Sequence, residues 1–378
     1  MIDTLMTTVA AAGTSGGEAF DGIKHFVNRI SVPEISLPLF TLLFIGMLVF
    51  YRQWTKPAVF TLIMVVFCGL YFGAMFIDHN YFLIVSKADN VPITLMLLAT
   101  LITLWLAFRQ AAINDANIEQ GKPLIEEGKD DKVLVWPDLV YSELICLVLA
   151  SALLVLWAVA LPAPLESPAN PAGPPNPSKA PWYFLGLQEM LVYFDPWMAG
   201  VILPGLIVTG LIAMPYIDTN PKGNGYYTFK ERPFAIASWL FGFLILWIVL
   251  IVFGTFLRGP NWNFFGPFEY WDSHLTVPLT NINLSEYFWL YALRQPLPDN
   301  PLVRETLGIV LTLAWLFVLP VVLAKTIMRR MFEQMGSIRF YILAVHLVVM
   351  GMLPVKMVLR WLFNLKYFVN LPEFNLNL

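Results

Sequence analysis

The chain has 378 residues, of which 58% are hydrophobic and only 13% are charged, and its mean hydropathy is +0.67. A soluble domain carries about 25% charged residues, so this composition excludes an ordinary soluble protein. The net charge of −3 and the lack of a basic tract also argue against nucleic-acid binding.

A polar arm, residues 1–34 with a short amphipathic piece near residues 20–30, precedes the first apolar runs. Each of these runs approaches the ~20 residues that a helix needs to cross a bilayer. They cover residues 35–51, 57–77 and 91–108. The connection that follows, residues 109–135, is the most charged part of the chain and predicts a domain boundary outside the membrane.

Five further apolar runs bring the expected number of transmembrane helices to about eight. They cover residues 139–161, 197–217, 234–257, 305–325 and 339–359. The predicted fold class is therefore all-α, a polytopic helical membrane protein with a proline-rich loop on its outer face. A long aromatic loop, residues 258–304, contains SEYFWLYAL, which we expect to be a helix at the membrane interface, where Trp and Tyr are favoured.

Lysine and arginine set the expected orientation. Thirteen of them fall in 66 positions on one side of the predicted spans, and seven fall in the much longer connections on the other side. The positive-inside rule places the first side in the cytoplasm, so the proline-rich loop and both termini face outward. Three basic residues near the C-terminus fall on the outer side, and snorkelling or a bend at Pro354 would account for them: Lys356, Arg360 and Lys366.

The proline-rich loop is the predicted functional site. Eight of the twenty residues 162–181 are proline, which fixes φ and removes a hydrogen-bond donor, so this half cannot be helical. From Trp182 the chain becomes aromatic and apolar, and Asp195-Pro196 ends this short run. A stiff tether followed by a helix too short to span predicts a re-entrant or surface-lying element that packs against protein.

Several chemistries lack the residues that they need. The sequence has no Walker loop, no HExxH and no CxxCH, and it indicates no metal site. Its four histidines are His25, His79, His274 and His346. No two of them share a predicted helix, so no paired ligands for a haem are available. Only His346 lies deep in a span, where a hydrogen bond between helices and a redox or proton role both remain open.

A set of ordered motifs resembles the C-terminal domain of cytochrome b, the part that forms a separate subunit IV in plastid-type complexes. The resemblance covers about residues 135–258, and it is carried by Trp136–Tyr141, Ser167–Pro171, Pro181–Phe184, Met214–Asp218, Asn220-Pro221 and Phe229–Ala235. Gly259–Trp262 and Pro354–Arg360 are similar to extended bacterial versions of this domain. Three regions follow: 1–134 with the arm and three additional helices, 135–258 as the cytochrome b-like domain, and 259–378.

The resemblance implies a membrane subunit of a cytochrome bc-type complex. Such a complex oxidises membrane quinol at an outer pocket, passes electrons to a Rieske iron–sulfur protein and cytochrome c, and releases protons outside. The haem b groups would sit on a partner chain, the haem-bearing N-terminal cytochrome b subunit. We also expect contact with membrane lipid, a dimeric complex and a location in the bacterial inner membrane. The alternative function is a transporter or channel gated by the proline-rich loop.

The resemblance implies that the quinol pocket is bordered by Pro181, Trp182, Tyr183, Phe184 and Leu185, with Tyr183 at the reacting quinol. The family motif is Pro-Glu-Trp-Tyr, but Pro181 occupies the glutamate position here and cannot accept a proton.

Another base must then lie near the bound ring. On a helix that starts near Trp182, residues 182, 185 and 189 share one face, so Glu189 is the candidate proton acceptor. Asp195 and Glu166 are alternatives, and Glu189 could instead pair with a neighbouring group.

A second quinone site is expected on the cytoplasmic side near Trp136–Tyr141. Asp138 could exchange protons with a reduced quinone there, beside Tyr141. The competing interpretation is that Asp138 is an interfacial carboxylate that complements the dipole at the start of a helix.

Overall fold

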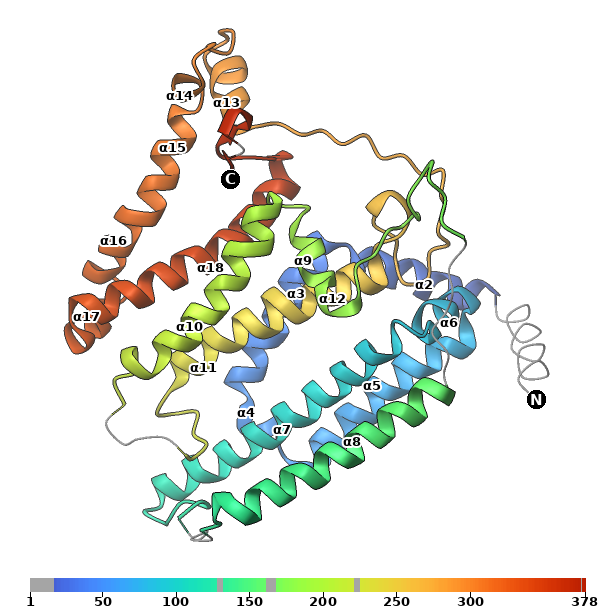
Figure 1. Ribbon diagram of the computed structural model, residues 1–378, viewed down its shortest axis with the longest axis vertical. Coiled ribbons are helices and arrows are strands. Elements are labelled where there is room, and N and C mark those ends of the chain that lie inside the picture. The colour runs from blue at the N-terminus through green and yellow to red at the C-terminus, as the bar shows by residue number, and fades with distance from the viewer. Residues whose placement is uncertain (1–16, 128–131, 161–167, 221–224, 375) are drawn as a thin grey trace.

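The computed structural model describes residues 17–127, 132–160, 168–220, 225–374 and 376–378. Glu166, the start of the proline-rich loop and the first sixteen residues of the arm lie outside them. Helices make up almost all of the described architecture (Figure 1). Two short strands, β1 (Asn370–Leu371) and β2 (Leu376–Asn377), pair antiparallel near the C-terminus.

The first part of the chain forms a bent helix pair and two apolar helices. The amphipathic helix α2 (Gly17–Ser31) meets α3 (Pro33–Val49), and Phe20–Ser31 makes an angle of 81° with α3. Pro33 at the first turn of α3 suits this break, since proline lacks the N–H that a continuous helix would use. The remaining elements of this part are α4 (Tyr51–Trp54), α5 (Pro57–Ile77), α6 (His79–Ser86) and α7 (Val91–Glu119).

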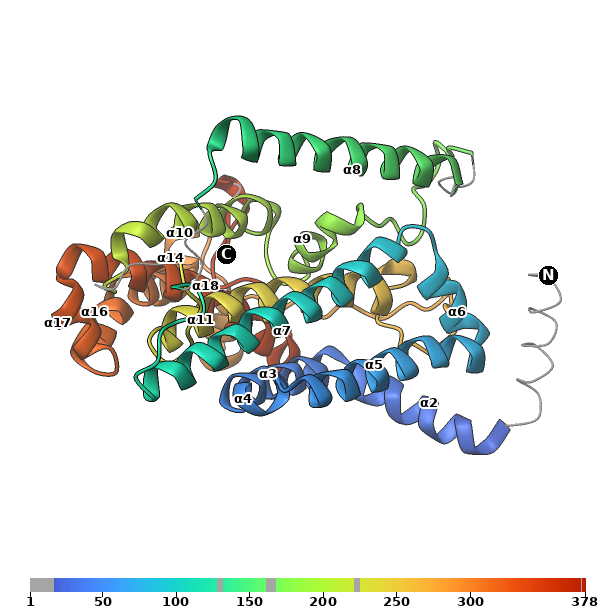
Figure 2. The same ribbon diagram turned by 90° about the horizontal axis from the view of Figure 1, so that it is seen from below.

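The middle of the chain contains one exposed span and two packed ones. A π-helical turn, η1 (Val135–Leu139), leads into α8 (Val140–Ala160), which has no buried residue and runs apart from the other helices (Figure 2). Another span comprises η3 (Met198–Ile202) and α10 (Leu203–Ile217).

The span Pro233–Leu257, here called the central span, is the most buried membrane helix of the described chain. It comprises α11 (Pro233–Leu240), η4 (Phe241–Ile248), α12 (Val249–Val252) and η5 (Phe253–Leu257).

The last part begins with the aromatic loop. Its expected helix is confirmed as α13 (Leu284–Glu286) continuing into η7 (Tyr287–Ala292). The next span contains α14 (Pro301–Arg304), α15 (Thr306–Leu313), η8 (Ala314–Val318) and α16 (Leu319–Lys325). It is followed by α17 (Arg329–Met335) and α18 (Ser337–Phe363). α18 passes through Pro354 without ending, and Lys356 is fully buried, so Lys356 does not snorkel to the surface.

The predicted fold class is confirmed. Seven described helices are long and apolar enough to cross a membrane, and the bent pair α2–α3 supplies an eighth. The core gathers around the central span, where Leu250, Ile251 and Phe253 are fully buried. Because hydrocarbon surrounds the helices in a bilayer, α5 and α8 can leave their apolar side chains uncovered.

A buried carboxylate, Asp115, joins the first three helices to the turn before the central span. It accepts hydrogen bonds from the hydroxyls of Tyr51 (2.8 Å) and Thr228 (2.5 Å) and from the backbone N–H groups of Phe229 (3.2 Å) and Lys230 (3.1 Å). Four donors satisfy one carboxylate, so the two segments are fixed together although they lie more than 100 positions apart.

We predict that Asp115→Ala destabilises this junction. Four donors would lose their acceptor, which costs about 3 kcal/mol and lowers the apparent melting temperature in detergent by on the order of 5 °C. Thermal unfolding followed by tryptophan fluorescence measures the change. The control is Asp89→Ala, at an exposed carboxylate. Equal melting temperatures for both variants would contradict the role of Asp115.

Candidate functional site

A glutamine of the following helix fastens the end of the proline-rich tether. No helix forms in the described tether, residues 168–181, as expected. The amide group of Gln188 fastens its end: the backbone N–H of Ala180 donates to Oε1 (2.8 Å), and Nε2 donates to the Ser178 carbonyl (2.8 Å). This clamp sets the position of Pro181 and of the aromatic residues after it.

The short run after the tether folds back against the protein. It starts as the 3₁₀ turn η2 (Trp182–Phe184) and continues as α9 (Leu185–Met190), which packs against α12 (Figure 1). Two glycines permit close packing on the central span: a Cβ at Gly254 would lie 3.0 Å from the Leu185 carbonyl oxygen, and one at Gly186 would lie 3.1 Å from the side chain of Ile251. The helix is therefore embedded in protein.

The residues expected at the quinol pocket divide into a buried and an exposed group. Leu185 is buried and Trp182 is half-buried, whereas Pro181, Tyr183 and Phe184 are exposed. The Tyr183 ring makes edge contacts with Trp182, Phe184 and Trp247, and the last of these belongs to the central span (ring centroids 6.2 Å apart). Trp182, Tyr183 and Phe184 together form an aromatic edge at the surface of the loop.

Glu189 is fully buried and forms an ion pair with Arg258. The guanidinium donates twice, from Nε to Oε2 (3.0 Å) and from Nη2 to Oε1 (2.7 Å), and the Tyr193 hydroxyl lies 3.5 Å from Oε1. Burial, together with the charge of Glu189, raises the pKa of Tyr193. Glu189 and Leu185 share the buried face of α9, one helical turn apart.

Asp195 lies one turn beyond α9 and is held by the C-terminal segment. It accepts hydrogen bonds from the Tyr367 hydroxyl (3.2 Å) and from the side-chain amide of Asn377 (3.4 Å). Both carboxylates that the structure describes in this loop therefore have partners.

Lys179, at the end of the tether, is a half-buried cation of the same region. Its ammonium donates to the carbonyl of Thr255 (2.8 Å) and lies 5.0 Å from the centroid of the Trp271 ring. Burial lowers the pKa of Lys179 to about 7, and the positive charges of Lys87 and Arg258 add to this effect.

The residues expected at a cytoplasmic quinone site lie at the other end of α8. The rings of Trp136 and Tyr141 stack (centroids 6.2 Å apart), and both side chains are exposed, as is Asp138. The 21 residues of α8 separate this end from the proline-rich loop by about 30 Å. The two groups of expected residues thus occupy opposite ends of the domain.

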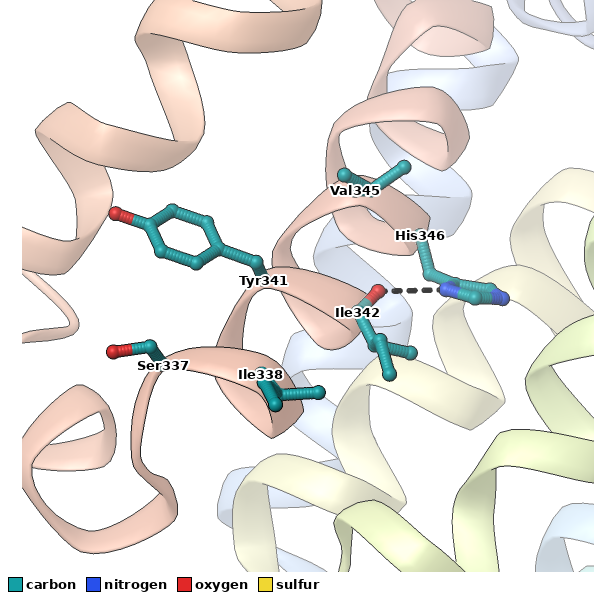
Figure 3. Close-up of a pocket in the computed structure, with 6 residues that line it drawn as sticks. All are labelled: Ser337, Ile338, Tyr341, Ile342, Val345 and His346. Carbon is teal, nitrogen blue, oxygen red and sulfur yellow. Dashed lines mark hydrogen bonds between the residues drawn. The ribbon is translucent and has the colours of Figure 1, made fainter.

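A shallow groove of about 570 Å³ lies on α18, lined by Ser337, Ile338, Tyr341, Ile342, Val345 and His346 (Figure 3). Both ring nitrogens of His346 are engaged, with the Ile342 carbonyl (2.7 Å) and, on α10, the Thr209 hydroxyl (3.0 Å). His346 therefore links two helices, as one of the two interpretations of this residue expected.

The described residues show no cluster of metal-ligating side chains. No group of three or more His, Cys, Asp or Glu side chains that could hold a metal ion occurs among them. The histidines lie on α2, at the start of α6, in the aromatic loop and on α18, and the nitrogens of His346 are occupied.

The family comparison addresses the same region. Residues 168–268 match the family model described as Cytochrome b(C-terminal)/b6/petD. This segment is a cytochrome b C-terminal domain. The match runs from the tether through α9, α10 and the central span into the aromatic loop, and it supports a cytochrome b-type subunit of a bc/b6f-type complex. No solved structure matches the chain.

Three residues of the cytochrome b domain escaped the sequence reasoning: Gln188, Arg258 and Lys179. Arg258 is the first charge after the apolar run 234–257, so it could have been noticed as a partner for a buried carboxylate. Lys179 is the only cation between the prolines and the aromatic run. For Gln188, no pattern indicates that its amide reaches back to residues 178 and 180.

We predict that Gln188→Met releases the tether. Loss of the hydrogen bond to the Ala180 N–H, worth about 1 kcal/mol, should speed its hydrogen exchange by on the order of fivefold. Exchange measured by mass spectrometry on peptides that cover residues 178–184 reports this. Gln120→Met, at an exposed position directly after α7, serves as the control. Unchanged exchange in Gln188→Met would show that the Gln188 hydrogen bonds do not fix the tether.

Proposed function

We propose that the chain is a membrane subunit of a cytochrome bc-type complex that oxidises membrane quinol. Electrons pass to a Rieske iron–sulfur protein and on to cytochrome c, and protons are released on the outer side. The observation that carries this proposal is the cytochrome b match over residues 168–268, within which the aromatic turn η2 leads into the short helix α9, folded against the central span.

The wall of the quinol pocket is the aromatic edge of this loop. Trp182, Tyr183 and Phe184 offer flat apolar faces to a quinol ring, and the Tyr183 hydroxyl would hydrogen-bond to one of its oxygens. Pro181 and the buried Leu185 fix the two ends of this edge. Aromatic and apolar lining with few polar groups is typical of sites for such ligands.

The haem b groups belong to a partner chain, the N-terminal cytochrome b subunit. Two observations support this arrangement: the four histidines lie on separate elements of the described chain, and α8 has no buried residue within the chain. An apolar helix open on every side is suited to contact with another membrane chain. The partner would lie along α8, with lipid on the remaining surface, and two such units would form the dimeric complex.

Proton acceptance by a carboxylate would involve Glu189 or Asp195. For Glu189, Arg258 would have to release the carboxylate first, because both carboxylate oxygens accept from the guanidinium. Asp195 would have to leave Tyr367 and Asn377. Glu189 remains the carboxylate candidate for this role because it lies on α9, the short helix that directly follows the aromatic edge of η2.

The orientation proposed from the basic residues places this loop and both termini outside the bacterial inner membrane. Lys179 and Arg258 then lie on the outer side, where protons leave, and the Asp115 junction lies on the cytoplasmic side.

The experiment that tests the function uses the complex purified from native membranes through a tag on this chain. A reduced-minus-oxidised spectrum should show b-type haem, and added quinol should reduce an external high-potential acceptor such as cytochrome c. A preparation without haem b and without quinol oxidation would refute the proposal. The chain produced without partner cytochromes should bind no haem, and a stoichiometric bis-histidine haem on it would contradict the partner-chain assignment.

The cytoplasmic site at Trp136–Tyr141 is proposed as a second quinone site. Asp138 would exchange protons with the reduced quinone, so Asp138→Asn should slow reoxidation of the b haem by quinone about tenfold, by analogy with the loss of a proton-transfer group. Stopped-flow spectroscopy of the purified complex measures it, with Glu143→Gln, one turn further along α8, as the control. An unchanged rate would leave Asp138 as an interfacial carboxylate only.

A further inference from the structure

Lys179 lies at the junction between the tether and the aromatic edge. It stands two residues before Pro181, the position where the family motif has glutamate. Its partner Thr255 follows Gly254, whose Cα approaches the Leu185 carbonyl. The ammonium and the start of α9 therefore contact consecutive residues of the central span.

Several buried polar atoms near Lys179 have no hydrogen-bond partner among the residues that the structure describes. They are the hydroxyl of Thr255, which is 1% exposed, and the indole N–H groups of Trp262 and Trp271. Thr255 accepts from Lys179 through its carbonyl, and Trp271 carries the ring beside the ammonium. Buried donors without acceptors are costly, and a ligand that brings oxygen atoms would satisfy them.

Three charged side chains near Lys179 affect its protonation. Lys87, in the connection after α6, and Arg258, at the end of η5, oppose its positive form, whereas Glu189 on α9 favours it. Glu189 is already engaged by Arg258, so its charge is largely compensated. The Lys179 side chain can therefore exist as a neutral amine near neutral pH, which agrees with its lowered pKa.

From this placement we propose that Lys179 is the catalytic base of the outer quinol pocket, and that it occupies functionally the place of the missing motif glutamate. The inference rests on the proposed function. The neutral amine takes the proton of one quinol hydroxyl, so the O–H bond breaks, an N–H bond forms, and a quinolate anion and an ammonium ion result. Two one-electron oxidants, the Rieske iron–sulfur partner and the haem of the partner chain, then take the two electrons.

The surroundings suit both states of the amine. In the neutral state, Nζ keeps an N–H for the Thr255 carbonyl and presents its lone pair to the quinol. After the transfer, the Thr255 carbonyl and the Trp271 ring hold the ammonium. The second proton of the quinol leaves to water at the exposed edge of Pro181 and Tyr183, and Lys179 returns its own proton to outer water.

The test is the pH dependence of quinol oxidation by the purified complex, with decylubiquinol or a menaquinol analogue as donor and haem content as the measure of assembly. In the native complex, kcat should rise through an apparent pKa near 7. Lys179→Met should lower kcat at pH 8 by at least tenfold. It should also remove the rising limb of the pH profile, which is the increase of kcat through this pKa. Lys179→Arg, which keeps a positive charge but cannot act as a base, should be equally slow.

Lys87→Met, at a nearby lysine of the outer side, is the matched control. Its pH profile should keep the rising limb, with the apparent pKa shifted slightly. Glu189→Gln should also keep a limb, even if its rate falls through loss of the ion pair. If the complex with Lys179→Met does not assemble, the pH profile of Lys179→Arg decides whether Lys179 is the base. A limb that persists in either Lys179 variant and disappears in Glu189→Gln would transfer the role to Glu189. A native complex that oxidises no quinol would refute the proposed function itself.

Discussion

The ion pair between Glu189 and Arg258 is the constraint on which the end of the protein that carries the proline-rich loop depends. A fully buried carboxylate is stable only when its charge is compensated, and here two charge-assisted hydrogen bonds from one guanidinium do this. The pair connects α9 to the residue directly after the central span. Removing one partner of such a pair costs about 3–5 kcal/mol, because the other charge is left buried. The short helix is thus held by electrostatics as well as by close packing at Gly186 and Gly254.

The same end is supported from the N-terminal part of the chain. Asn28 on α2 accepts from the Phe268 N–H (3.0 Å), Asn80 on α6 donates to the Glu269 carbonyl (2.7 Å), and Lys24 pairs with Asp78. α2 and α6 therefore hold the aromatic loop, which in turn supplies Trp262 beside Arg258 and Trp271 beside Lys179. The family match ends at residue 268, so these helices stabilise the end of the cytochrome b domain from outside it.

The spans were predictable because their apolar runs are long and because bilayer thickness sets the length of a helix. The fold-back of the loop was also predictable, since proline excludes helix in the tether and the aromatic run is too short to cross. What the sequence pattern does not determine is which distant residues pair. Arg258 could be noticed as a partner for a buried carboxylate, but nothing singles out Glu189, 69 positions away, and Asp115 and Thr228 are 113 positions apart. Lys356 shows the same limit. Its position suggested an interfacial cation, yet the rings of Tyr367 and Phe368 cover its ammonium.

The exposed helix α8 and the buried helix α9 are stabilised in different ways. One can therefore contact other chains while the other holds the loop in place. In hydrocarbon, the backbone hydrogen bonds of a helix suffice to keep it formed, so α8 needs no partner inside the chain and its whole surface remains open to another subunit or to lipid. α9 has only six residues, fewer than an isolated helix needs for stability, so it must obtain its stability from packing and from the Arg258 pair. Association with other chains can therefore occur along α8 without disturbing the loop, whereas any change at Arg258 acts on the loop directly.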